Sequence, residues 1–189
     1  MKALVLAIAL FAASGCAAFT RPSSGVTKLT LPPGFAASIH ATGVEGARMM
    51  AVSPAGTLFV GTKTSKVWAI PWPADGVAAE PIVFADGLEQ PNGVAFRDGA
   101  LYVAERRRIL RFPDAEKNLA APPAPEVVTA KLPRYAHHGL RVIGFGPDGR
   151  LYVAVGAPCN ICEPERDKYG VIYRVRRDGE LEVFARGVR

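Results

Sequence analysis

A hairpin pattern that recurs three times along the chain constrains the fold more than any other feature. In each copy a short turn ending in Gly is followed by an apolar segment, and the copies are residues 53–61, 96–104 and 146–154. The turn glycines Gly56, Gly99 and Gly149 are 43 and 50 residues apart. Tight turns between apolar runs predict β-hairpins. A repeat of this length therefore decides the fold.

Each hairpin is accompanied by the further segments that a four-stranded sheet needs. First strands are expected at residues 49–52, 94–96 and Val142–Phe145. Third strands are expected at Val67–Ile70, Ile109–Phe112 and Val171–Val175. Fourth strands are expected at residues 81–84, Glu126–Thr129 and residues 181–184. Four short strands in about 45 residues are a propeller blade, and no later segment has helical periodicity. The sequence therefore predicts an all-β protein, a β-propeller of four-stranded blades.

About three blades are present, which is too few for a ring, because propellers use roughly four to eight. An open arc would expose the apolar face of a whole blade to water. We therefore expect residues 31–189 to be the amino-terminal half of a propeller domain. Residues 17–30 are rich in turn-forming residues and are expected to be a linker. Residues 29–40 are expected to supply an early strand of the ring.

Residues 1–15 have the features of an export signal. Lys2 gives a positive start, and residues 3–13 are an unbroken run of apolar and small side chains. This run is shorter than the roughly 20 residues of a membrane-spanning helix. It leads through Ala-Ser-Gly to Cys16, which resembles the lipobox of bacterial lipoproteins, where the cysteine is lipidated. The alternative is an ordinary cleavage near Ala18. Both predict an exported protein of the periplasm or cell envelope, and the lipid would anchor it to the membrane.

The net charge of +6 does not indicate a nucleic-acid partner. The basic residues are spread among the strand segments, and their largest cluster is residues 106–108. Nucleic-acid recognition needs a basic face or a known motif, and the sequence offers neither. The charge suits solubility or attraction to an anionic surface.

Cys159 and Cys162 form a Cys-Asn-Ile-Cys motif. In an oxidising compartment this motif predicts a local disulfide that pins a loop. A thioredoxin-like redox site is the alternative, but no βαβ pattern surrounds the motif. Haem attachment would need a His where Glu163 stands, and zinc would need two further ligands.

The loop before the third hairpin carries the residues with the clearest chemical potential. Arg134, His137, His138 and Arg141 lie within eight positions, just ahead of an expected first strand. In a propeller, loops at this place surround the central channel. A His there can act as a general base, and an Arg such as Arg141 can hold a carboxylate of a substrate or cofactor. The alternative is that the His pair caps a turn or lies in solvent.

Three segments resemble the glucose/sorbosone dehydrogenase family: residues 138–153, 157–163 and 90–105. The second and third resemble its sorbosone dehydrogenase-like branch in particular, and the likeness extends over about residues 30–189. The family consists of six-bladed propellers that bind pyrroloquinoline quinone (PQQ) over the central channel. The resemblance therefore implies that the three blades belong to a ring of six.

The resemblance also implies roles for individual residues. The family's catalytic His precedes the Pro of its Gly-Pro-Asp turn by nine positions, which selects His138 here and makes His137 its neighbour. Arg189 stands where the family has a quinone-binding Arg. A quinone-contacting Gln corresponds to Gln90 or, with a shift of two positions, to Asn92. The family's calcium site belongs to a part that is not in this chain.

The implied reaction is the oxidation of a sugar or a related alcohol or aldehyde. His138 would take the hydroxyl proton while hydride leaves the same carbon for the quinone; the electron acceptor that follows is not indicated. One alternative is a metal-dependent lactonase propeller, with Glu105, Asn92 and Asn160 as candidate metal ligands. The other is a non-catalytic envelope binding module.

Overall fold

The computed structural model describes residues 29–72, 79–134, 138–163 and 165–188. The chain divides into two units, Met1–His40 and Ala41–Arg189. The predicted signal peptide, Cys16, residues 17–28 of the linker and Arg189 lie outside the described residues. The prediction of an early strand at residues 29–40 is wrong, since these residues form no strand. Pro32 and Pro33 offer no N–H to a strand partner, and Leu29 and Phe35 are exposed.

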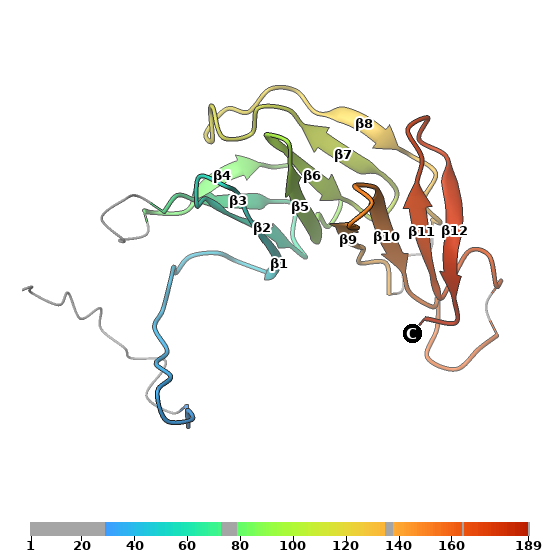
Figure 1. The fold of residues 1–189 in the computed structure, drawn as a ribbon, viewed down its shortest axis with the longest axis horizontal. Helices are drawn as coiled ribbons and strands as arrows, with labels where there is room; N and C mark the ends of the chain where they lie inside the picture. The colour runs from blue at the N-terminus through green and yellow to red at the C-terminus, as the bar shows by residue number, and fades with distance from the viewer. Residues whose placement is uncertain (1–28, 73–78, 135–137, 164, 189) are drawn as a thin grey trace, which may run out of the picture. The chain divides into compact units, whose positions relative to one another are not determined.

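The described residues of the second unit form twelve strands in three antiparallel sheets (Figure 1). The first sheet contains β1 (Ala47–Val52), β2 (Leu58–Thr62), β3 (Val67–Ile70) and β4 (Ile82–Ala85). The second contains β5 (Gly93–Arg97), β6 (Ala100–Ala104), β7 (Ile109–Phe112) and β8 (Glu126–Thr129). The third contains β9 (Val142–Phe145), β10 (Leu151–Val155), β11 (Val171–Val175) and β12 (Leu181–Arg186). The described residues include no helix that is long and apolar enough to cross a membrane.

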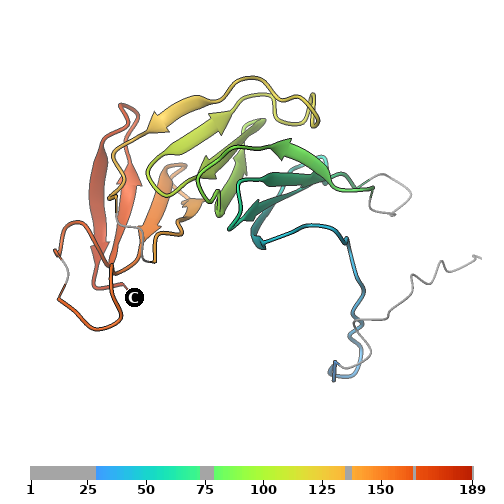
Figure 2. The same ribbon diagram turned by 180° about the vertical axis from the view of Figure 1, so that it is seen from behind.

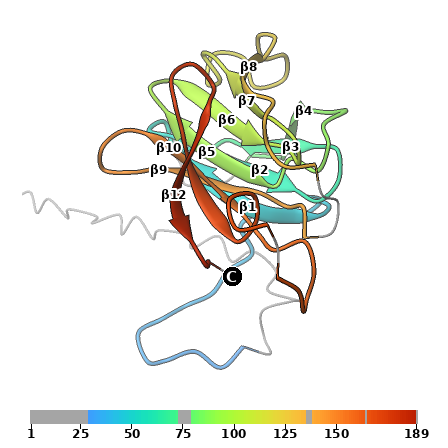
Figure 3. The ribbon, with the colours of Figure 1, turned by 90° about the vertical axis from the view of Figure 1, so that its right-hand side faces the viewer.

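The strands of each sheet follow one another in chain order. The first strands of the sheets are neighbours, with β5 between β1 and β9. Figures 1 and 2 show the three sheets following one another along the chain, and Figure 3 shows them from the side of β12. Consecutive four-stranded sheets whose first strands lie side by side are arranged like propeller blades. The predicted all-β blade structure is confirmed, and none of the described sheets closes on itself.

The hairpin turns explain why the repeat carries Gly at a fixed place. Between β5 and β6 the two turn residues Asp98 and Gly99 have φ values of 48° and 75°. Both values lie in the left-handed region, as a type I′ turn requires, and this turn matches the natural twist of a hairpin. Asp-Gly is among the dipeptides that adopt it most readily. The turn chemistry therefore fixes the register in which Arg97 pairs with Ala100.

The second sheet is apolar on both faces because it packs between the other two. Towards the first sheet, Leu101, Val103 and Phe112 pack with Phe59 and Phe84. In this cluster the rings of Phe59 and Phe84 meet edge to face, with centroids 5.2 Å apart. The near-continuous apolar runs of β6 and β7 thus reflect burial on both sides, as expected for a central blade.

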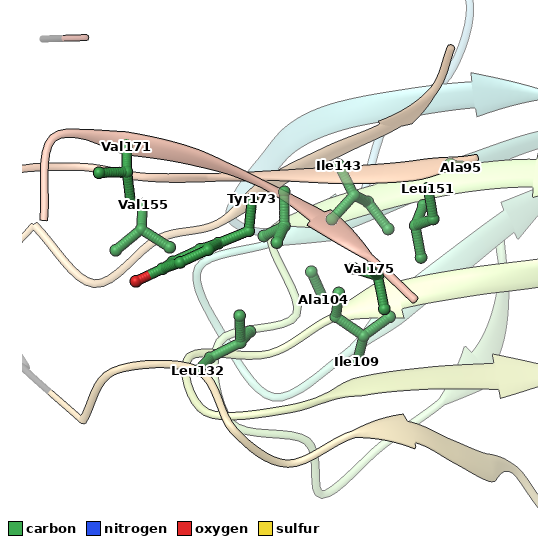
Figure 4. Packing of buried hydrophobic residues seen from close by; sticks show 11 residues of the cluster. Ala95, Ala104, Ile109, Leu132, Ile143, Leu151, Val155, Val171, Tyr173 and Val175 are labelled. Carbon is green, nitrogen blue, oxygen red and sulfur yellow. The ribbon is translucent and has the colours of Figure 1, made fainter. Parts of the chain in front are cut away.

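A second cluster joins the second sheet to the third (Figure 4). Ala104, Ile109 and Leu132 face the side chains of Val155 and Tyr173 from β10 and β11. Burial of such side chains stabilises a fold by about 1.5–3 kcal/mol each. This cluster therefore holds the second and third sheets together directly beneath the loops that carry the predicted site.

The outward faces of the first and third sheets differ from the inner ones. Met50 and Val52 of β1 are 62% and 65% exposed, and Phe184 of β12 is 60% exposed. Tyr152 packs edge to face against Phe184 on this open face of the third sheet. Apolar side chains at this density on a sheet face are typical of surfaces that another layer covers.

Candidate functional site

The loops that lead into β5 and β9 meet at one end of the sheets. The side-chain amide of Asn92, directly before β5, donates a hydrogen bond of 2.6 Å to the main-chain carbonyl of Arg141, directly before β9. The N–H of Thr62, which ends β2, donates to the carbonyl of Pro91 at 3.0 Å. A Cβ at Gly93 would lie 2.7 Å from the carbonyl oxygen of Arg141. Contacts between these loops therefore join all three sheets at this end. Position 93 requires Gly, because any Cβ there would clash with the Arg141 carbonyl.

Arg141 is a buried clamp for the neighbouring loops. Only 2% of the residue is exposed. Its Nε donates to the carbonyl of Arg106 at 3.0 Å, and its Nη2 donates to the carbonyl of Pro133 at 2.7 Å. Burial lowers the pKa of Arg141 from its ordinary value, since the charged form is desolvated. Two of the five guanidinium N–H donors of Arg141 thus bond main-chain carbonyls, and its contact with a ligand carboxylate stays a prediction.

Glu105 neutralises part of the basic cluster at the same end. Its carboxylate is 1% exposed and accepts hydrogen bonds from the N–H of Glu89 at 2.6 Å and from Nε of Arg108. The bond to Glu105 raises the pKa of Arg108. Glu89 in turn pairs with Arg107 at 2.8 Å and with Arg106 at 3.6 Å. The cluster is thus a network that orders the loop after β6, rather than a free basic patch.

His138 lies in the loop that leads into β9 and is exposed. Its φ of 52° is in the left-handed region, which non-Gly residues adopt infrequently and chiefly at functional or tightly constrained sites. Its Nε2 lies 2.8 Å from Oδ1 of Asn160, which belongs to the loop between β10 and β11. His137 lies outside the described residues. The structure therefore presents an accessible imidazole whose ring orientation depends on a neighbouring loop.

The predicted disulfide between Cys159 and Cys162 is present, with a Cα–Cα distance of 6.0 Å. It closes a ring of four residues that contains Asn160 and Ile161. The sequence indicated Asn160 only as a candidate metal ligand, and its contact with His138 was missed. The signal that could have found it was its place inside the Cys-Asn-Ile-Cys motif, where a disulfide would hold it at a loop tip.

Gln90 and Asn92, the two alternatives for a cofactor-contacting amide, differ in accessibility. Asn92 is 2% exposed, and its Oδ1 is buried without a hydrogen-bond partner in the described part of the chain. Gln90 is half-buried and has a φ of 50°. Asn92 therefore joins two sheets, and Gln90 is the one of the pair whose side chain solvent can reach.

The residues suggested for a lactonase metal site have separate partners. Glu105 is held by Arg108 and Glu89, Asn92 by the carbonyl of Arg141, and Asn160 by His138. Across residues 29–72, 79–134, 138–163 and 165–188, no group of three or more His, Cys, Asp or Glu side chains could hold a metal ion. The lactonase metal site therefore stays a prediction.

A cavity of about 680 Å³ lies between the loop after β10 and the end of β12. Ala157, Cys162, Tyr169 and Arg186 are among its lining residues, and His138 is not. The cavity therefore borders the loop that contains the disulfide, and it is separate from the surface that His138 presents.

Taken with the blade-like sheets, these loops define the class of protein: an all-β chain with propeller blades and a candidate site where the loops into the first strands meet. No protein-family model matches the chain, and no curated protein matches it.

Solved structures with a similar fold do match. The holo PQQ domain of pyranose dehydrogenase from Coprinopsis cinerea matches with a TM-score of 0.61 at 13% identity, over 72% of this chain and 34% of that one. The PQQ-bound aldose sugar dehydrogenase from Streptomyces coelicolor matches with a TM-score of 0.56 at 22% identity, over 75% and 47%. A putative glucose dehydrogenase from Thermus thermophilus matches with a TM-score of 0.55 at 21% identity, over 74% and 47%. This chain thus shares their fold and spans a third to a half of their length.

Proposed function

We propose that this chain belongs to an exported, PQQ-dependent dehydrogenase that oxidises a sugar or a related alcohol or aldehyde. The observation that carries the proposal is the position of His138, an exposed imidazole at the entrance to β9 that is bonded to Asn160 at 2.8 Å. The motifs around it resemble the glucose/sorbosone dehydrogenase family. Similarity in fold to PQQ-binding sugar dehydrogenases supports the same function.

The charge of the site suits an anionic cofactor. Residues 106–108 are all arginines at this end of the sheets, and the carboxylates of Glu89 and Glu105 pair with them. Arg134, one residue after the carbonyl that Arg141 clamps, is exposed. PQQ carries carboxylates, for which arginine forks are the preferred partners. The exposed Arg134 therefore fits a cofactor of this kind by charge, whereas the arginines at 106–108 already pair with carboxylates.

The proposed mechanism assigns one role to each accessible residue. PQQ, when bound, supplies the acceptor of two electrons that such an oxidation needs. His138 takes the proton of the substrate hydroxyl, for which a neutral imidazole is suited near neutral pH. Gln90 contacts the cofactor as a neutral hydrogen-bonding group. Arg189, which lies outside the described residues, binds the quinone by a charge-assisted contact.

The experiment uses the protein encoded by the complete gene, reconstituted with PQQ and calcium. Sugar-dependent reduction of a redox dye is measured over a panel of aldoses and sorbosone-like aldehydes, with the protein lacking PQQ as the control. The proposal predicts turnover only with PQQ. Calcium-dependent hydrolysis of lactones without PQQ would replace it by the lactonase, and ligand binding without any turnover would replace it by the binding module.

We also propose that the protein is a lipoprotein of the bacterial envelope, with the lipid on Cys16. The support is the sequence pattern of residues 1–16. Several acyl chains on one residue anchor a protein stably, whereas one chain does not. Wild type and a Cys16→Ala variant are compared by detergent partitioning, with and without globomycin, which blocks lipoprotein signal cleavage. Partitioning of the wild type into the detergent phase is expected, and its full recovery in the soluble periplasmic fraction would contradict the anchor.

A further inference from the structure

We infer that the Cys159–Cys162 disulfide acts on the reaction through Asn160, by holding this residue against the ring of His138. Asn160 is thus a positioning residue whose effect depends on the redox state of the loop. The inference rests on the proposed function, in which His138 is the base.

The loop between β10 and β11 has two differently held parts. Its second part is fixed to the third sheet: the hydroxyl of Tyr173 donates to the carbonyl of Asp167, and the Asp167 carboxylate pairs with Nε of Arg186 at 2.6 Å. Its tip is the ring that the disulfide closes around Asn160 and Ile161. Ile161 is 96% exposed, so the tip projects into solvent. The covalent bond therefore restricts the tip of the loop at Asn160.

Restricting the backbone of the loop tip matters because the side chains of both His138 and Asn160 are exposed. Ordering an exposed side chain costs conformational entropy that a single hydrogen bond to solvent-accessible groups barely offsets. A disulfide next to Asn160 removes most of the backbone freedom before the contact forms. The bond of 2.8 Å between Nε2 of His138 and Oδ1 of Asn160 can then persist at an exposed position.

The contact also determines what the ring can do. An amide oxygen only accepts hydrogen bonds, so Nε2 of the neutral ring must carry the proton. Nδ1 then carries the lone pair that can accept a substrate proton. Asn160 therefore fixes both the tautomer and the rotation of His138, in the manner of the orienting partner in other acid–base sites.

The first test follows the ring itself and needs no activity. Histidine rings in the complete protein are labelled with ¹⁵N, and the signal of His138 is assigned by its loss in His138→Gln. The chain is measured before and after dithiothreitol, which reduces the disulfide to two thiols and is itself oxidised to its cyclic disulfide. Main-chain amide signals of β5 and β10 report whether the fold persists.

We expect the oxidised chain to show a protected Nε2–H proton on His138. This signal should be lost on reduction and in Asn160→Leu, and kept in Asn160→Asp, which retains an oxygen at the same place. Ile161→Ala, a change inside the same ring that leaves Asn160 intact, is the matched control and should keep it. An Nε2–H signal that survives reduction or Asn160→Leu, with the fold intact, would overturn the inference.

The second test connects the ring to turnover in the complete protein. Asn160→Leu should lower the rate constant of sugar oxidation about 10- to 100-fold with little change in KM, as expected for a misplaced catalytic group. Reduction of the Cys159–Cys162 disulfide should lower the rate constant of the wild type by a similar factor. It should have no further effect on the Asn160→Leu variant, because the disulfide and Asn160 act through the same contact with His138. Independent, additive effects would overturn the inference. If the ring responds as predicted but the complete protein oxidises no sugar, the proposed function fails instead.

Discussion

The side-chain amide of Asn92 donates to the main-chain carbonyl of Arg141 at 2.6 Å, and this single bond joins the entrance of β5 to the entrance of β9. Asn92 is 49 residues from Arg141 in the chain, so the bond is a long-range contact between two repeats. The same residue, Arg141, donates from its guanidinium to the main-chain carbonyls of Arg106 and Pro133. The loop that carries His138 is therefore bonded both to the segment before β5 and to the loop after β6.

Asn92→Ala should lower the free energy of unfolding by about 1–3 kcal/mol, because it removes a buried hydrogen bond and leaves the Arg141 carbonyl without it. Asn118→Ala is the matched control. Asn118 also bonds a main-chain group, the N–H of Ala121 at 3.1 Å, but it is exposed, and its loss should cost within about 0.5 kcal/mol. Urea unfolding monitored by circular dichroism measures both. Equal effects of the two variants would contradict the role given to Asn92.

Gly93→Ala should destabilise the junction of the second and third sheets by about 1–3 kcal/mol, because it overpacks a close contact. The added Cβ would lie 2.7 Å from the Arg141 carbonyl oxygen and 3.2 Å from Cβ of Ala104. Gly144→Ala in β9 is the control, since a Cβ there meets nothing within 4 Å. Thermal unfolding should show a lower Tm for Gly93→Ala only. A Gly93→Ala protein as stable as Gly144→Ala would show that the two loops do not approach this closely.

Tyr173→Phe should change how stability depends on alkaline pH. Burial, followed by the charge of Asp167, raises the pKa of Tyr173 above its ordinary value of 10.0. A group whose pKa is raised on folding stabilises the folded state at pH values below its unfolded pKa, and this contribution is lost as pH rises through the folded pKa. The wild-type free energy of unfolding should therefore fall more steeply above about pH 10 than that of Tyr173→Phe. Parallel curves in urea titrations from pH 8 to about 11 would contradict this assignment.

Much of the fold could be predicted from the sequence because its rules are local. The third strands Val67–Ile70, Ile109–Phe112 and Val171–Val175 agree with the prediction at both ends. Turn glycines and apolar runs determine hairpins over short distances. The early strand at residues 29–40 could not be judged in this way, since a strand exists only where a partner supplies hydrogen bonds.

The site was less predictable, because it depends on contacts between repeats. The sequence placed His138 and Arg141 in one loop, and the family resemblance implied that Gln90 or Asn92 contacts the same cofactor. The structure brings the loops that carry these residues to one end of the sheets. Which of these side chains is accessible depends on burial that no local pattern encodes. Arg141 and Asn92 turn inward to main-chain carbonyls, whereas His138 remains exposed.

The central claim is that His138 is a general base, and its most direct measurement is stopped-flow reduction of PQQ by sugar in the complete protein. A general base contributes roughly 10²–10⁴-fold to rate. His138→Ala should therefore lower the rate constant of quinone reduction by about this factor while PQQ affinity and the unfolding curve stay unchanged. His137→Ala, the neighbouring imidazole, should lower it far less. Reduction of PQQ by His138→Ala at the wild-type rate would contradict the account.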